Sequence, residues 1–220
     1  MTAMIDPDRD CSLCPRLHGF VAKQRAMYPD WHNAPVATFY PPDGPESVEF
    51  LVVGLAPGLR GANRTGRPFT GDYAGDLLYG TLDRFGFCRG TFDARPDDGI
   101  EMVGTAITNA VRCVPPENKP VGAEINTCRR FLSASLQAMP NLRALLTLGK
   151  IAHDSTIRML GERVAAHPFA HNACTEAGSY MVFSSYHCSR YNTNTGRLTE
   201  EMFVDVFRNV AAFLDPGRRQ

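Results

Sequence analysis

Four short, mainly apolar runs divide the chain at wide intervals and lack the polar alternation of half-exposed strands. Runs of this kind are typical of strands that are buried on both faces of a sheet. They predict strands at residues 50–56, 103–110, 142–148 and 180–184.

Segments of helical character follow these predicted strands. They cover residues 73–85, 123–138, 150–160 and 198–214. Because strand and helix alternate, we predict an α/β fold, a three-layer α/β/α sandwich around a four-stranded parallel sheet. Ligands of such sheets bind beyond the carboxyl ends of the strands, so a site is expected in the loops there.

The length of 220 residues fits one domain, and we predict a single domain over residues 1–220. Residues 1–45 precede the first strand and contain Cys11, Cys14 and Trp31. A segment of this size rarely sustains a core without a metal or a disulfide. We therefore expect residues 1–45 to be an extension that wraps over the sheet.

Composition and charge narrow the class of protein. No apolar run approaches the roughly 20 residues that cross a bilayer, so no membrane partner is expected. The start of the chain lacks the basic and apolar stretches of a secretory signal, which predicts a cytoplasmic protein. Lys and Arg number 23, as do Asp and Glu, so the formal net charge is zero. A nucleic-acid partner would need a local basic patch.

Four of the seven cysteines are spaced as metal ligands are. Cys11 and Cys14 can offer two thiols from one tight turn, and Cys113 and Cys128 form a second pair. Four thiolates suit tetrahedral zinc or a [4Fe–4S] cluster equally well on spacing alone. An odd number of cysteines without a signal peptide argues against a disulfide framework. Three cysteines show no such pairing and are interpreted as small buried side chains: Cys88, Cys174 and Cys188.

Polar loops follow three of the predicted strands and should meet at one edge of the sheet. The first loop, residues 54–72, is rich in glycine, which allows close backbone approach to a ligand. Its polar side chains include Asn63, Arg64, Arg67 and Asp72. The second strand ends at Asn109, whose amide can present a donor and an acceptor to the edge of a base. The fourth runs into His187, and the convergence of three such loops favours a functional site.

These loops resemble the motifs of the family 5 uracil-DNA glycosylases, the UDGb type of the iron–sulfur uracil-DNA glycosylases. The similar segments are residues 54–57, 61–72, 108–120, and His187 with 195–199. The resemblance extends from Cys11 to about Thr199. Leu55 stands where the related family 4 enzymes carry a Glu, which favours family 5.

The resemblance implies a uracil-DNA glycosylase fold and a monofunctional enzyme that hydrolyses the N-glycosidic bond in base excision repair. Its partner would be DNA that contains uracil or other deaminated bases, such as hypoxanthine and xanthine. It also implies a [4Fe–4S] cluster, rather than zinc, on the four paired cysteines: Cys11, Cys14, Cys113 and Cys128. Separately, we expect a monomer, although the sequence leaves the oligomeric state open. The cluster would hold the N-terminal extension against the core.

Roles for individual residues follow from the same resemblance. The base must leave the stack before it can be excised. The positions implied to bind it are Gly54, Ala56, Pro57, Gly58, Phe69 and Asn109, with Phe69 stacking on the base and Asn109 reading its edge. His187 would stabilise negative charge on the departing base. Asp72 would orient water or counter the sugar cation, since Ala56 replaces the motif aspartate of classical enzymes, and Asn63 would assist.

The candidate DNA contacts are Arg64, Arg67, Lys119, Arg190, Tyr191 and Arg197. Arg190 and Tyr191 stand where a wedge residue would fill the vacated stack. One departure is Cys188, where the family usually has a proline, in the loop that enters the minor groove.

Two other function classes are compatible with parts of the sequence. An iron–sulfur redox or electron-transfer protein would use the cysteines but would leave Phe69, Asn109 and His187 unexplained. A nucleotide-binding module would use the glycine-rich loop, which lacks the lysine of a P-loop.

Overall fold

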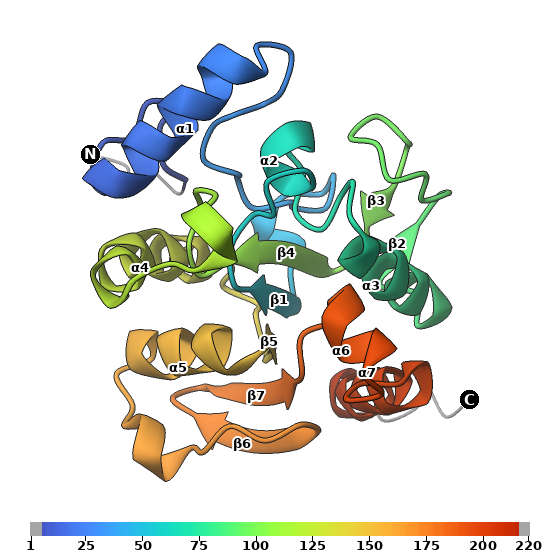
Figure 1. Cartoon of the computed structure of the whole chain (residues 1–220). Helices are drawn as coiled ribbons and strands as arrows, with labels where there is room; N and C mark the ends of the chain where they lie inside the picture. The colour runs from blue at the N-terminus through green and yellow to red at the C-terminus, as the bar shows by residue number, and fades with distance from the viewer. Residues whose placement is uncertain (1–5, 216–220) are drawn as a thin grey trace.

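A computed structural model describes residues 6–215 of the chain. Its centre is a five-stranded sheet in the order β4-β1-β5-β7-β6 (Figure 1). The strands are β1 (Phe50–Gly54), β4 (Thr105–Asn109), β5 (Ala144–Leu148), β6 (Ala173–Ala177) and β7 (Tyr180–Ser185). Strands β4, β1, β5 and β7 are parallel, which confirms the four predicted strands.

The predicted count of four strands is too low, because β6 adds an antiparallel strand beside β7. The side chains of β6 alternate between intermediate and exposed over its first four residues. Such an edge strand has no continuous apolar run from which it could be recognised.

Helices cover both faces of the sheet, as predicted. On one face, α3 (Tyr73–Arg84) and α7 (Glu200–Leu214) pack with Phe50 and Val52 of β1. On the other, α4 (Gly122–Gln137) and α5 (Lys150–Met159) pack with Leu51 and Val53. Successive residues of β1 thus enter opposite cores, which is why the strand is apolar throughout.

A long N-terminal helix, α1 (Pro15–Met27), was not predicted. Its apolar and polar positions are poorly segregated, and Leu17 and Val21 pack into a third cluster with Val111, Val114 and Phe131. Proline occupies its first turn, where no backbone donor is lost. The extension thus packs on the sheet domain.

Arg16 fixes the start of α1 to a segment more than 100 residues away. Its guanidinium donates to both carboxylate oxygens of Glu124, at 2.7 and 2.8 Å, and to the Lys119 carbonyl at 3.0 Å. The same Glu124 carboxylate accepts the backbone N–H of Val121 at the start of α4. One ion pair therefore joins α1, α4 and the loop before α4.

Short elements complete the described chain: η1 (Pro45–Ser47), α2 (Ala62–Thr65), β2 (Cys88–Arg89), β3 (Glu101–Met102), η2 (Pro116–Asn118), η3 (Val164–Ala166) and α6 (Arg190–Asn194). Within residues 6–215, no helix is long and apolar enough to cross a membrane.

Candidate active site

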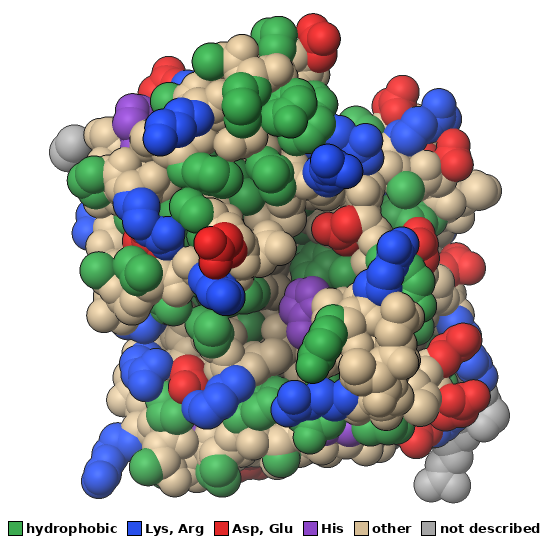
Figure 2. All heavy atoms as spheres, in the orientation of Figure 1, with side chains coloured by type: hydrophobic (Ala, Val, Ile, Leu, Met, Phe, Trp, Pro, Cys, Tyr) green, Lys and Arg blue, Asp and Glu red, His purple; other side chains and the backbone are tan. Residues whose placement is uncertain are grey.

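The loops that follow β1, β4 and β7 surround a cavity of about 510 Å³. It opens on one face of the molecule, with a histidine beside the hollow (Figure 2). The lining residues are Leu55, Ala56, Pro57, Gly58, Ala62, Phe69, Asp72, Tyr73, Ala74, Asn109, Asn118, His187, Ser189 and Arg190. The sequence prediction that polar loops converge at this edge of the sheet is correct.

Asn109 lines this cavity, whereas Gly54, which the sequence predicts to contact the base, stands beside Asn109 and does not line it. They are paired residues at the ends of the parallel strands β1 and β4, so their side-chain positions are adjacent. A Cβ atom on Gly54 would lie 2.7 Å from Cζ of Phe69 and closer still to Oδ1 of Asn109. Only glycine lets the amide of Asn109 and the ring of Phe69 approach this close to the strand.

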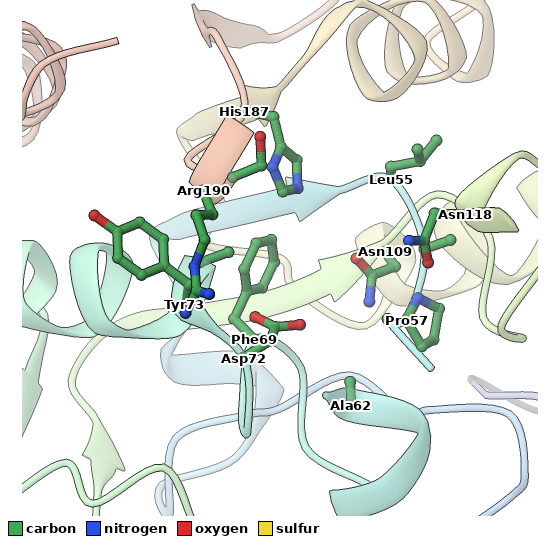
Figure 3. Close-up of a pocket in the computed structure, with 14 residues that line it drawn as sticks. Leu55, Pro57, Ala62, Phe69, Asp72, Tyr73, Asn109, Asn118, His187 and Arg190 are labelled. Atoms are coloured by element: carbon green, nitrogen blue, oxygen red, sulfur yellow. The ribbon is translucent and has the colours of Figure 1, made fainter. Parts of the chain in front are cut away.

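Phe69 and His187 reach the cavity from opposite loops (Figure 3). Their ring centroids are 5.9 Å apart, and their planes differ by 26°. Phe69 is 7% exposed and has a φ of 52°, an unusual backbone for an aromatic residue. An apolar ring beside a planar polar one gives the cavity the character of a slot for a flat heterocycle.

His187 is held by the short helix α6. The side chain of Asn192 in this helix donates to the carbonyl of His187 at 2.8 Å, and Ser189 caps the helix by accepting the N–H of Asn192. Burial lowers the pKa of His187 to about 4. Its imidazole is therefore neutral at physiological pH and can donate one hydrogen bond without carrying a charge.

Asp72 lies at the start of α3, with its carboxylate beside the cavity (Figure 3). Burial raises its pKa, although the backbone amides of Ala74 and Gly75 oppose that effect. Its Oδ1 is buried without a hydrogen-bond partner in the described part of the chain. Gly61 leaves room for this carboxylate, because a Cβ there would overlap Oδ2. An underpaired carboxylate is free to accept a bond from a ligand or water.

Asn63 does not line the cavity, so its predicted part in catalysis requires correction. Its side chain is fully buried and donates to Oδ1 of Asn33 at 2.9 Å. The backbone N–H of Asn33 in turn donates to the Asn63 carbonyl. Asn63 thus fastens α2 to the N-terminal segment, a link that depends on a residue 30 positions earlier.

Of the predicted DNA contacts, Arg190 lines the cavity, and Arg64, Lys119 and Arg197 are also exposed on the surface. Arg190 lies over the Tyr73 ring with Cζ 5.2 Å from its centroid, and Arg197 lies over Tyr186 at 4.7 Å. Tyr191 is 73% exposed.

Arg67 is the exception, and its assignment to a phosphate contact is wrong. Its side chain is only 6% exposed, and both terminal nitrogens bond Asp98 at 2.7 Å. A guanidinium that is enclosed and paired in this way is not available to DNA.

Tyr73, Asn118 and Ser189 also line the cavity and were missed in the sequence. Asn118 lies in one of the motif segments, but the direction of its side chain depends on a left-handed backbone at two successive residues. The φ angles are 55° at Glu117 and 56° at Asn118. No pattern of residue types reveals such a bend.

Side chains of Cys11, Cys14, Cys113 and Cys128 line a second, smaller cavity between α1 and α4. Burial, followed by the neighbouring thiols, raises the pKa of Cys113 to about 12. No group of three or more His, Cys, Asp or Glu side chains among residues 6–215 is placed so that it could hold a metal ion. Of the other cysteines, Cys88 and Cys188 are buried as predicted, whereas Cys174 is exposed.

A model of the Uracil DNA glycosylase superfamily matches residues 41–211, so the fold and the site define a member of this class. A type-5 uracil-DNA glycosylase of Thermus thermophilus is 42% identical over 203 residues, which cover 89% of this chain and 90% of the relative. A type-5 enzyme of Pyrobaculum aerophilum is 38% identical over a match that covers 92% of this chain and 88% of the relative. A type-4 enzyme of Sulfurisphaera tokodaii is 30% identical over a match that covers 76% of this chain and 72% of the relative. The chain belongs to the type-5 family of uracil-DNA glycosylases.

Proposed function

We propose that this enzyme extrudes uracil from DNA into the cavity and hydrolyses the bond between N1 of the base and C1′ of the sugar. The observation that carries the proposal is the cavity itself, where an aromatic ring, an amide, a neutral imidazole and an underpaired carboxylate meet. These groups match the four needs of the reaction: stacking, base recognition, leaving-group stabilisation and support of the sugar cation.

Each step uses a group in the cavity. The base stacks on Phe69, and the amide of Asn109 pairs with its edge. As the bond breaks, its electron pair moves to the base, and the neutral imidazole of His187 donates a hydrogen bond to the negative pyrimidine oxygen. The carboxylate of Asp72 lies near the developing sugar cation and accepts a proton as water adds to C1′.

The proposed substrates include hypoxanthine and xanthine, in a base excision repair role. The cavity of about 510 Å³ is open to the surface and exceeds the volume of a pyrimidine ring, which leaves room for a purine. DNA would be held at the rim by Arg64, Lys119, Arg190 and Arg197, and Tyr191 would enter the vacated stack.

Excision from labelled duplexes that carry uracil, hypoxanthine or xanthine tests this function. We expect His187→Ala and Asn109→Ala each to lower excision of uracil by at least about tenfold while the protein stays folded, since each removes a transition-state contact. Near-normal rates in both variants would contradict the site assignment. Circular dichroism supplies the control for folding.

A [4Fe–4S] cluster on Cys11, Cys14, Cys113 and Cys128 is proposed as well. The four cysteines line one cavity, but their side chains are not placed so that they could hold a single metal ion. The shared cavity supports the proposal, because it brings together thiols from both ends of the 11–128 segment. Positive charge from the iron ions of a cluster would lower the raised pKa values of Cys14, Cys113 and Cys128 and would stabilise the thiolate ligands. When bound, the cluster would act as a structural cross-link.

Iron and zinc assays of the purified protein distinguish a cluster from zinc. We expect iron in the wild type, and Cys113→Ser to lose that iron and to unfold at a lower temperature. The exposed Cys174→Ser is the matched control and should keep both properties. Reversible reduction of a loaded cluster in a protein without excision would favour the redox alternative.

A further inference from the structure

The segment that carries Phe69 begins with an arginine that faces inward. Arg67 donates from Nη1 and Nη2 to the two carboxylate oxygens of Asp98, both at 2.7 Å. Its Nε donates to Oγ1 of Thr70, also at 2.7 Å. The side chains of Arg67 and Asp98 are 6% and 1% exposed. The ion pair is therefore part of the interior, where loss of one partner is costly.

Three aromatic rings enclose this guanidinium. Its Cζ lies 5.4 Å from the ring centroid of Phe39, 5.3 Å from that of Tyr79 and 5.7 Å from that of Phe92. Cations are attracted to such ring faces, most strongly where water is absent. The three rings come from three separate parts of the chain, so the arginine joins segments that are not neighbours in sequence.

Both neighbours of Phe69 are tied to this cluster. The hydroxyl of Tyr79 donates to the carbonyl of Pro68 at 2.9 Å, and the side chain of Thr70 accepts from Arg67. Between them, Phe69 has a φ of 52°. An aromatic residue keeps such a backbone only where its surroundings hold it there. The cluster supplies that restraint at residues 68 and 70.

The partner of Arg67 comes from the loop of residues 93–99, which precedes β3. Asp98 also accepts the backbone N–H of Asp93 at 3.0 Å and that of Ile100 at 3.2 Å. Both of its oxygens are thereby committed, and its position is fixed within the loop. The 93–99 loop contributes a buried counter-charge next to the site, without lining the cavity.

We propose that Arg67 and Asp98 are positioning residues that hold the ring of Phe69 in the conformation that stacks on the extruded base. This inference rests on the proposed function, in which the base stacks on Phe69. The pair acts through Phe69 and touches no substrate. Its loss should release the strained backbone at residue 69 and displace the stacking surface.

Asp98→Asn is the test, since it keeps the volume of the side chain and removes the charge. We expect kcat/KM for a uracil duplex to fall about 10- to 100-fold, the loss that a displacement of about 1 Å causes. Glu101→Gln is the matched control. Glu101 of β3 pairs with Arg89 of β2 at 2.7 Å, and both side chains are exposed. Because exposed ion pairs contribute little, we expect Glu101→Gln to lower kcat/KM far less than tenfold.

A double-mutant cycle with Phe69→Ala separates positioning from a general loss of structure. If the pair acts through the ring, Asp98→Asn adds no further loss in the Phe69→Ala background. Losses that multiply, or an Asp98→Asn enzyme with a normal rate, would overturn the inference. If Asp98→Asn does not fold, Tyr79→Phe replaces it in the cycle, because it removes only the bond to the Pro68 carbonyl. Failure of the wild type and Glu101→Gln to release uracil would instead refute the proposed function, and with it this inference.

Discussion

Asp72→Asn should lower the rate of uracil excision by about 100- to 1,000-fold, the loss typical of removing a group placed against transition-state charge. The amide has the shape of the carboxylate but can neither balance the sugar cation nor accept the proton from water. Single-turnover excision measures the effect. Asp76→Asn in the first turn of the same helix is exposed and should excise normally. A rate within tenfold of the wild type for Asp72→Asn would remove the carboxylate from the mechanism.

The same substitution should leave the protein as stable as the wild type or more stable. Burial raises the pKa of Asp72, so the charged carboxylate destabilises the folded state at neutral pH. As the pH falls through the folded pKa and then below the ordinary value of 3.8, the carboxyl becomes neutral in both states and the difference vanishes. Excision by the wild type should decline over the same acid range. Thermal unfolding at pH 7 and at pH 3 measures the stability difference.

Gly54→Ala should reduce excision of uracil by about 100-fold, because a single methyl group displaces two substrate contacts at once. The added Cβ would lie 2.7 Å from the Phe69 ring and still nearer to the Asn109 oxygen. A shift of about 1 Å in either group is enough for a loss of this size. The backbone of Gly54 is that of an ordinary strand, so the substitution creates no conformational strain in the chain itself.

Gly80→Ala is the matched control for that substitution. Gly80 lies on the exposed side of α3, and a Cβ there would meet no atom within 4 Å. This variant should excise normally and gain about 0.5 to 1 kcal/mol in its free energy of unfolding, since alanine is the better helix former. Equal activities of Gly54→Ala and Gly80→Ala would show that the site tolerates a methyl group at residue 54.

The sequence predicts the four parallel strands because each is a continuous, mainly apolar run, and it predicts the helices between them from their helical character. Strand β6 escapes prediction because it lies at the edge of the sheet and shares its faces with solvent. Helix α1 escapes for a related reason, since only one narrow side of it packs against the core.

Within the site, the sequence locates Phe69, Asn109 and His187, which line the cavity, but not the residues that support the site. Asn63 and Arg67 stand in the glycine-rich loop and have the residue types of functional groups. Their roles are decided by Asn33 and Asp98, which lie 30 and 31 residues away. A residue type shows which bonds a side chain can make, whereas only the fold decides which partner is present.

The pairing of Arg16 with Glu124 has a consequence for biosynthesis. Helix α1 comes before the sheet in the chain, yet Glu124 and the buried side chains that cluster with Leu17 and Val21 all lie beyond residue 110. The nascent helix must wait for more than half of the chain to emerge before it can dock, and the closure of so long a loop is slow. During synthesis we therefore expect α1 to dock only after α4 has emerged and formed.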